Sequence, residues 1–171
     1  TLSSAASDVY KRQIWDIESS SASTDFGSII EIGGVLVDEN FKEKDRFNLR
    51  CRLPEGEIFQ AMALIVNKTS IKKLTQANLS HYEMLAEVEK IFKKWSPAIF
   101  LGWSNIGFDD EMIRKEFFKG IRYPYLTNAA PNKRHDGINI ARAAYAVDPN
   151  ILEVEFLSLI HISEPTRQPN I

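Results

Sequence analysis

The sequence lacks several features that would place it quickly in a class. Only one of its 171 residues, Cys51, is a cysteine, which excludes an internal disulfide framework and fits a reducing compartment such as the cytoplasm. No apolar run approaches the ~20 residues that a membrane-spanning helix needs, so we expect no membrane association. Lys and Arg (21) do not outnumber Asp and Glu (23), which excludes a globally basic nucleic-acid binder but allows a local basic groove.

Both ends of the chain look foreign to the rest. Residues 8–13 (DVYKRQ) are a translation of GATGTGTATAAGAGACAG, and the reverse complement of that DNA translates as LSLIHI, which is residues 157–162. This pairing is typical of transposon adapters from sequencing libraries. We expect residues 1–13 and 157–171 to be adapter-derived, and residues 14–156 to be one domain truncated at its C-terminus. The alternative is a genuine polar N-terminus and a C-terminal apolar strand.

The segment between these ends begins with three predicted strands. Residues 14–18 and the β-branched run 28–37 form the first two. In the third, apolar and polar residues alternate, which predicts a strand with one buried face made by Phe47, Leu49, Cys51 and Leu53.

Helices and a further strand follow. Ser80 and Glu83 have the spacing of a capping box, and the helix that they open ends before Pro97. Other helices are expected at 69–78, at 109–119 with Gly120 closing it, and at about 136–146, with a buried strand at 98–103. The resulting order, β-β-β-α-β-α-α, predicts an α/β fold with a mixed central sheet.

Two carboxylates interrupt the first strand. Asp16 and Glu18 are two residues apart, so both side chains leave one face of the strand, while Trp15 and Ile17 leave the other. Two carboxylates on an otherwise apolar strand repel each other and resist desolvation unless a cation neutralises them. A divalent metal would do so; an edge strand with a solvated face is the alternative.

A second acidic group lies where the strand at 98–103 gives way to a helix. The segment 105–111 reads NIGFDDE and places Asp109 at the helix start. In open α/β sheets, ligands gather at such strand ends. Acidic residues at a helix N-terminus also complement the helix dipole without any ligand, so this motif alone leaves both interpretations open.

Together these motifs resemble a known family. The pair IWDIES and NIGFDDE is similar to the first two motifs of the DEDD exonuclease superfamily (DEDDh type), which has an RNase H-like fold. The segments LGWSNIGFDDEMIRKEFF and RHDGINIARAAYAV resemble its bacterial exodeoxyribonuclease I branch, although His135 replaces a Trp of that pattern. The resemblance implies a metal-dependent 3′–5′ exonuclease that hydrolyses single-stranded DNA.

The resemblance also implies a site. Two Mg²⁺ ions, which Mn²⁺ can replace, would lie about 3.5–4 Å apart. Asp16 would bridge them, Glu18 would hold the ion on the nucleophile side, and Asp109 would help to hold the other. Asp110 would be a neighbour and not a ligand. Substrate contacts would come from the residues Ser19, Ala63, Leu64, Asn105 and Phe108.

One expected motif is missing from the sequence. The family uses a histidine general base followed, five positions on, by a fourth aspartate. Here His81 is followed by Ala86, His135 by Ile140 and His161 by Thr166. Because that motif normally comes after the segment that ends near residue 154, we expect truncation to have removed it. The 171-residue chain is then inactive although its parent is active.

Further substrate contacts are weaker predictions. Met62 and Leu64 belong either to the ordinary core or to a surface that stacks on bases. Trp95 and Trp103 are expected in the core, and Tyr123 and Tyr125 have no assigned role. A phosphate-tracking surface, or simply a solvated face, could be formed by the basic residues Arg50, Arg52, Lys68, Lys72, Lys73, Lys93 and Lys94.

Two other functions remain open. The same acidic motifs occur in RNA-trimming and proofreading exonucleases, so RNA is an alternative substrate. A nuclease-fold module that binds nucleic acid without cutting it is the other, although such a module has no physical need for three converging carboxylates. The sequence indicates no protein partner.

Overall fold

The structure, a computed structural model, describes residues 11–150. The predicted adapter segments lie outside these residues except for positions 11–13. No helix within the described part is long and apolar enough to cross a membrane.

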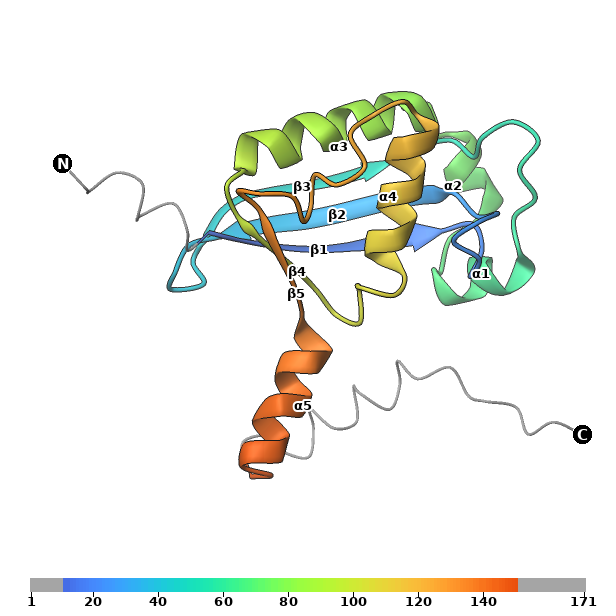
Figure 1. Cartoon of the computed structure of the whole chain (residues 1–171). Helices are drawn as coiled ribbons and strands as arrows, with labels where there is room; N and C mark the ends of the chain where they lie inside the picture. Colours follow the sequence, from blue (N-terminus) through green and yellow to red (C-terminus); the bar gives the residue numbers. More distant parts are fainter. Residues whose placement is uncertain (1–10, 151–171) are drawn as a thin grey trace, which may run out of the picture.

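In the described part of the chain the strands form one five-stranded mixed sheet (Figure 1). Strands β1 (Arg12–Ser19), β2 (Ile29–Val37) and β3 (Glu43–Arg50) form an antiparallel meander. On the other side of β1, strand β4 (Ile99–Gly102) pairs in parallel, and β5 (Lys133–Asp136) pairs in parallel with β4. The strand order β3-β2-β1-β4-β5 therefore puts β1 in the centre of the sheet.

Residues 11–150 also contain five helices, of which the first four lie between strands and the last follows β5. They are α1 (Ala61–Val66), α2 (Ile71–Thr75), α3 (His81–Trp95), α4 (Asp109–Lys119) and α5 (Gly137–Val147). The Ser80–Glu83 capping box that opens α3 is formed as predicted. Helices α3 and α4 cover one face of the sheet, whereas α5 extends away from it (Figure 1).

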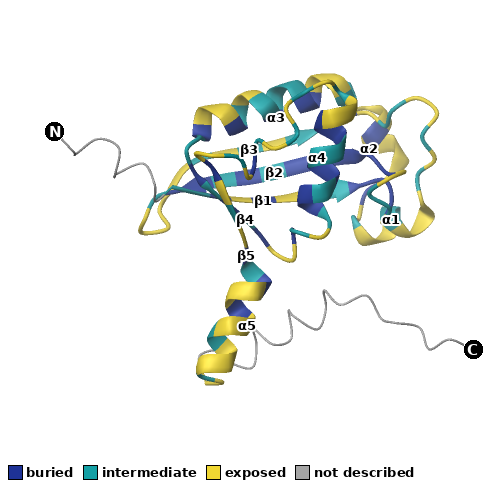
Figure 2. Ribbon diagram, viewed as in Figure 1, coloured by how far each residue is buried: buried dark blue, intermediate teal, exposed yellow. Residues whose placement is uncertain are grey.

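The core lies between the sheet and helices α3 and α4. Phe92 of α3 is fully buried and makes edge-to-face ring contacts with Trp15 of β1 and Phe100 of β4. Figure 2 shows the buried residues concentrated in these elements, while α1 and most of α5 are exposed. The covered face thus supplies the apolar stability, and the opposite face of β1 remains available for polar side chains.

Several sequence predictions need correction. The helix expected at 69–78 is only α2, and α1 and β5 were not predicted. The third strand ends at Arg50, after which Cys51 forms a single bridge with Leu79. Trp95 is buried as predicted, but Trp103 is 37% exposed and does not belong to the core.

The end of α4 also differs in detail from the prediction. Gly120 has φ −80°, and the left-handed residue is instead Ile121 with φ 56°. The amides of Ile121 and Arg122 donate to the carbonyls of Phe118 and Phe117, which is the bonding pattern of a Schellman motif. The helix therefore ends at the predicted place, but the left-handed position that favours glycine is occupied by Ile121, one residue after Gly120.

Candidate active site

Strand β1 presents its carboxylates as the period-two pattern predicted. Trp15 and Ile17 are buried in the core, whereas Asp16 and Glu18 face the opposite side of the sheet. Pairing with β2 extends through both residues, Asp16 opposite Gly33 and Glu18 opposite Glu31, whereas pairing with β4 ends at Ile14. The β1–β2 ladder therefore fixes the backbone that carries the two carboxylates.

The third carboxylate is placed by the junction between β4 and α4. A side chain at Gly102 would put its Cβ 2.5 Å from the Cβ of Asn105, so only glycine permits this close approach. The carbonyl of Asn105 accepts a hydrogen bond from the amide of Asp110 (2.9 Å), and Asp109 is the first residue of α4. The turn thus brings Asp109 to the edge of β1.

Ser104 gives the same junction a strained backbone. Its φ of 57° lies in the left-handed region, which a non-glycine residue rarely adopts. Its amide donates to Asp136 Oδ1 (2.8 Å), and the same oxygen accepts from the amide of Ile138 at the start of α5. Asp136 therefore ties the β4–α4 turn to the beginning of the last helix.

These elements surround one cleft, which we call the carboxylate cleft. Its volume is about 590 Å³, and Asp16, Glu18 and Asp109 all line it. Of the predicted substrate residues, Ser19, Ala63 and Phe108 line it as well. Leu64 is half-buried and is not part of its wall. Asn105 is fully buried in the β4–α4 turn and is not part of the wall of the cleft.

Two residues that were not expected at the site, Trp103 and Glu31, lie beside the carboxylates. Trp103 lines both the carboxylate cleft and a neighbouring hollow of about 570 Å³ on the open face of the sheet. Glu31 lines that hollow too, directly across the strand pair from Glu18. A tryptophan after a buried strand predicts core packing, and only the pairing register of β1 and β2 reveals the position of Glu31.

The electrostatics of the cleft oppose ionisation. Burial raises the pKa of Asp109 to about 8, and the nearby charge of Asp16 adds to the effect. Burial is also the main reason that the pKa of Asp16 is raised. The pKa of Glu18 is raised by burial and then by Asp16 and Glu31, with Arg50 opposing. Three carboxylates with raised pKa values in one cleft form an environment that a cation would stabilise.

The donor chemistry fits a divalent cation, but the geometry of a finished site is not present. Carboxylate oxygens are the ligands that Mg²⁺ prefers, and all three candidates face the same cleft. Among residues 11–150, no group of three or more His, Cys, Asp or Glu side chains is arranged so that it could hold a metal ion. The metal site therefore stays a prediction that the shared cleft and the raised pKa values support.

Most of the predicted phosphate-tracking residues have other partners. Arg50 Nε donates to Glu31 Oε2 (2.9 Å), and Arg52 donates to the carbonyls of Ala77 and Asn78. Lys93 and Lys94 pair with carboxylates of α3 and β3. The exposed lysines near α1 and α2 are Lys68, Lys72 and Lys73. Because Arg50 and Arg52 are engaged with these partners, the seven basic residues do not form one continuous basic groove.

The rings of Tyr123 and Tyr125 meet edge to face, with centroids 6.0 Å apart. Both side chains are about half exposed, at 52% and 48%. Neither lines the carboxylate cleft.

Comparisons with known proteins find relatives at low sequence identity. No family model matches the chain. Exodeoxyribonuclease I of Buchnera aphidicola subsp. Schizaphis graminum is 23% identical over 163 residues, which cover 92% of this chain and 34% of the relative. Exodeoxyribonuclease I of Haemophilus influenzae is 25% identical over 138 residues, or 80% of this chain and 29% of the relative. The chain thus spans about a third of the length of these relatives.

Solved structures extend the likeness to the fold. Escherichia coli exonuclease I in complex with a dA16 oligonucleotide matches with a TM-score of 0.78 at 20% identity, over 84% of this chain and 32% of the other. A zinc-bound form of the E. coli enzyme with single-stranded DNA and a complex of exonuclease I with SSB-Ct match with TM-scores of 0.78. The last complex names a protein partner for that relative, which the sequence of this chain did not indicate.

The order of the strands and the match to E. coli exonuclease I show that the chain has an RNase H-like nuclease fold. In sequence, the chain is similar to exodeoxyribonuclease I of two bacteria, at 23% and 25% identity. The predicted fold class and the predicted resemblance to exodeoxyribonuclease I are confirmed.

Proposed function

We propose that this chain is the nuclease portion of a metal-dependent 3′–5′ exonuclease that acts on single-stranded DNA. The observation that carries the proposal is the common cleft of Asp16, Glu18 and Asp109 in a nuclease fold. The raised pKa values of the three carboxylates support it, because they predict a cation as the natural partner of the cleft.

The three carboxylates would hold two Mg²⁺ ions, with Asp16 shared between them. Bound divalent ions supply Lewis acidity and an activated water for phosphodiester hydrolysis. The strand and the helix hold the carboxylates from two directions, so the scissile phosphate would lie between β1 and α4. Phe108 and the α1 residues that line the cleft offer apolar surface on which the terminal bases can stack.

Single-stranded DNA is the preferred substrate because the matching E. coli structures hold DNA oligonucleotides. Because the matching exonuclease I also forms a complex with SSB-Ct, we propose SSB as a protein partner of the complete protein. RNA remains the alternative substrate. Hydrolysis rates of matched DNA and RNA oligomers by the full-length parent separate the two, and faster RNA hydrolysis would overturn the DNA assignment.

We also propose that residues 14–156 are an incomplete domain between adapter-derived ends, so that this chain is inactive while its parent is active. Neither described histidine, His81 or His135, is followed by an aspartate five positions on. Strong Mg²⁺-dependent nuclease activity of the purified chain, abolished by Asp16→Ala, would contradict this proposal.

Metal binding gives the first test of the site. Isothermal titration of the chain with Mn²⁺ is expected to show binding that Asp16→Asn abolishes. The matched control is Glu39→Gln, which removes one exposed acid at the β2–β3 turn and should leave Mn²⁺ binding unchanged. If the full-length parent binds no Mn²⁺, the proposal fails, and a module that binds nucleic acid without cutting it becomes the better assignment.

A further inference from the structure

Helix α1 is a wall of the carboxylate cleft that has almost no packing of its own. Met62, Ala63 and Val66 line the cleft, yet none of the six residues of α1 is buried. Its N-cap residue, Gln60, makes no side-chain capping bond. An isolated helix of this length is not stable in water, so contacts at its ends must hold it in place.

Those contacts lead to one short segment, the serine turn, which we define as residues 19–28. At the start of α1, the amide of Gln60 donates to the carbonyl of Ser20 (3.0 Å). At its end, Asn67 Nδ2 donates to the carbonyl of Ser19 (2.8 Å). Ser19 directly follows Glu18, so α1 is attached to the same piece of backbone that carries a candidate metal ligand.

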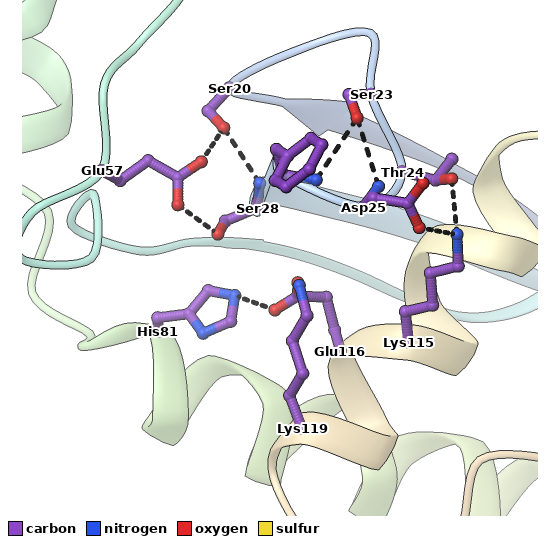
Figure 3. A network of polar contacts seen from close by, with 11 residues as sticks. Ser20, Ser23, Thr24, Asp25, Ser28, Glu57, His81, Lys115, Glu116 and Lys119 are labelled. Atoms are coloured by element: carbon purple, nitrogen blue, oxygen red, sulfur yellow. Dashed lines mark hydrogen bonds and ion pairs between the residues drawn. The ribbon is translucent and has the colours of Figure 1, made fainter.

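Glu57 fastens the approach to α1 onto this turn (Figure 3). One carboxylate oxygen accepts a hydrogen bond from Ser20 Oγ, and the other accepts from Ser28 Oγ (2.6 Å). Ser20 Oγ also accepts from the amide of Ser28 (2.9 Å), which closes the network. Ser20 and Ser28 are both buried and Glu57 is half-buried, so these bonds are partly shielded from water.

The far side of the serine turn is attached to α4. Lys115 Nζ contacts Thr24 Oγ1 (2.8 Å) and Asp25 Oδ1 (2.6 Å), as Figure 3 also shows. The turn thus links the helix that begins with Asp109 to the segment that carries α1. Glu57 itself does not line the carboxylate cleft, but lies at a separate hollow beside Phe26 and Ile58.

We propose that Glu57 is a positioning residue. By joining Ser20 and Ser28, Glu57 holds α1 in place as the apolar wall of the carboxylate cleft. Glu57 thereby sets the affinity of the cleft for single-stranded DNA, although Glu57 itself does not contact the DNA. The part of this inference that concerns DNA rests on the proposed function. The part that concerns the position of α1 does not.

Three measurements on the 171-residue chain test the inference. Glu57→Ala removes both acceptors, and the amides of residues 61–67 should then exchange with solvent at least about tenfold faster while those of α3 do not. The dissociation constant for a 5′-fluorescein-labelled oligothymidylate in Mg²⁺ should rise about tenfold. Mn²⁺ affinity should stay the same, because its ligands come from β1 and α4.

Matched variants separate positioning from loss of fold. Glu55→Ala removes an exposed acid two residues away and should change none of the three readouts. Glu57→Gln should recover most of the DNA affinity, since serine hydroxyls can accept from the amide that replaces one oxygen. Asn67→Ala releases the other end of α1 and should raise its exchange rate even if Glu57→Ala fails to fold.

The outcomes are distinct. Unchanged exchange of residues 61–67 in Glu57→Ala would overturn the inference, as would equal losses of Mn²⁺ and DNA binding, which indicate general unfolding. If the unaltered chain binds no oligothymidylate, the DNA part of the proposed function fails for this chain. The exchange rates of Glu57→Ala still decide whether Glu57 holds α1.

Discussion

A buried amide in β1 should make the chain less stable than it could be. Gln13 is completely buried, and among residues 11–150 neither its Oε1 nor its Nε2 has a hydrogen-bond partner. Its neighbours in the pairing register are Leu36 of β2 and Phe100 of β4, which are both buried and apolar. Gln13 thus lies on the same buried face of β1 as Trp15 and Ile17, at a position that suits an apolar side chain.

The magnitude follows from the cost of unsatisfied polar groups. Each buried donor or acceptor without a partner costs roughly 1–3 kcal/mol, and this amide has one of each kind. Gln13→Met keeps the length and the unbranched shape of the side chain while it removes both groups. We expect the free energy of unfolding to rise by about 2 kcal/mol.

Urea denaturation measures this change directly. With a slope of about 1.5 kcal/mol per M, the midpoint should move up by about 1.3 M without a change in slope. The control Gln76→Met replaces an exposed glutamine at the end of α2 and should move the free energy by less than about 0.5 kcal/mol. An unchanged or lower midpoint for Gln13→Met would refute the reasoning, because it would show that the amide is satisfied.

The predicted adapter origin of residues 1–13 offers a reason for this misfit. Backbone pairing in a sheet does not depend on the side chain, so foreign residues can extend β1 to Arg12. The side chain at each position still enters whatever environment the strand provides. An amide that no selection placed there would be buried without partners, as Gln13 is.

Three further predictions concern other parts of the chain. Ile121→Gly should stabilise it by about 1 kcal/mol in urea melts, because it relieves the left-handed backbone at the end of α4, whereas Ile121→Ala should give only part of this gain. His81→Gln should cost about 3 kcal/mol, since His81 Nε2 lies 2.9 Å from the buried Glu116 Oε2, and Lys119→Gln on the exposed side should cost less than about 1 kcal/mol. Burial favours a raised pKa for Glu116, but His81 and Lys119 outweigh it and lower the pKa. The resulting stability is present above the unfolded value of 4.5 and is lost as the pH falls through the folded value. Urea midpoints of His81→Gln, which keeps only Lys119 beside Glu116, should therefore depend less on pH in this range. Asp109→Asn should remove Mn²⁺ binding, yet it should stabilise the metal-free chain by at least about 2 kcal/mol at pH 9 and by little at pH 4. The reason is that the stability linked to the Asp109 pKa of about 8 is complete below pH 3.8 and is lost as the pH rises through 8. Equal effects of the substitution at pH 4 and pH 9 would show that the pKa of Asp109 is not raised.

The elements that sequence reasoning found have local signals that act within the element itself. The capping box of α3 and the period-two alternation of β1 depend on neighbouring residues, so both could be predicted. Strand β5 reads KRHD and has no apolar pattern, because its place depends on pairing with β4. Helix α1 has neither a side-chain cap nor a buried residue, so no local signal marked it.

The same distinction divides the candidate site. Asp16, Glu18 and Asp109 could be predicted because strand geometry and the strand-to-helix junction place them. Trp103 and Glu31 could not, since their positions depend on how β4 and β2 lie beside β1. The partner of Arg50 could not be predicted for the same reason, because its cross-strand partner Glu31 is nineteen positions away in the sequence.

The two sides of the carboxylate cleft are therefore held by different forces. Asp16 and Glu18 lie on the central strand, whose other face packs against Phe92. The free energy gained by burying this apolar interface offsets the repulsion between the neighbouring carboxylates. The opposite wall, α1, depends on hydrogen bonds to the serine turn. Apolar burial fixes the groups whose spacing a metal would require, and the weaker polar attachment leaves the wall that faces the bases free to adjust to any of them.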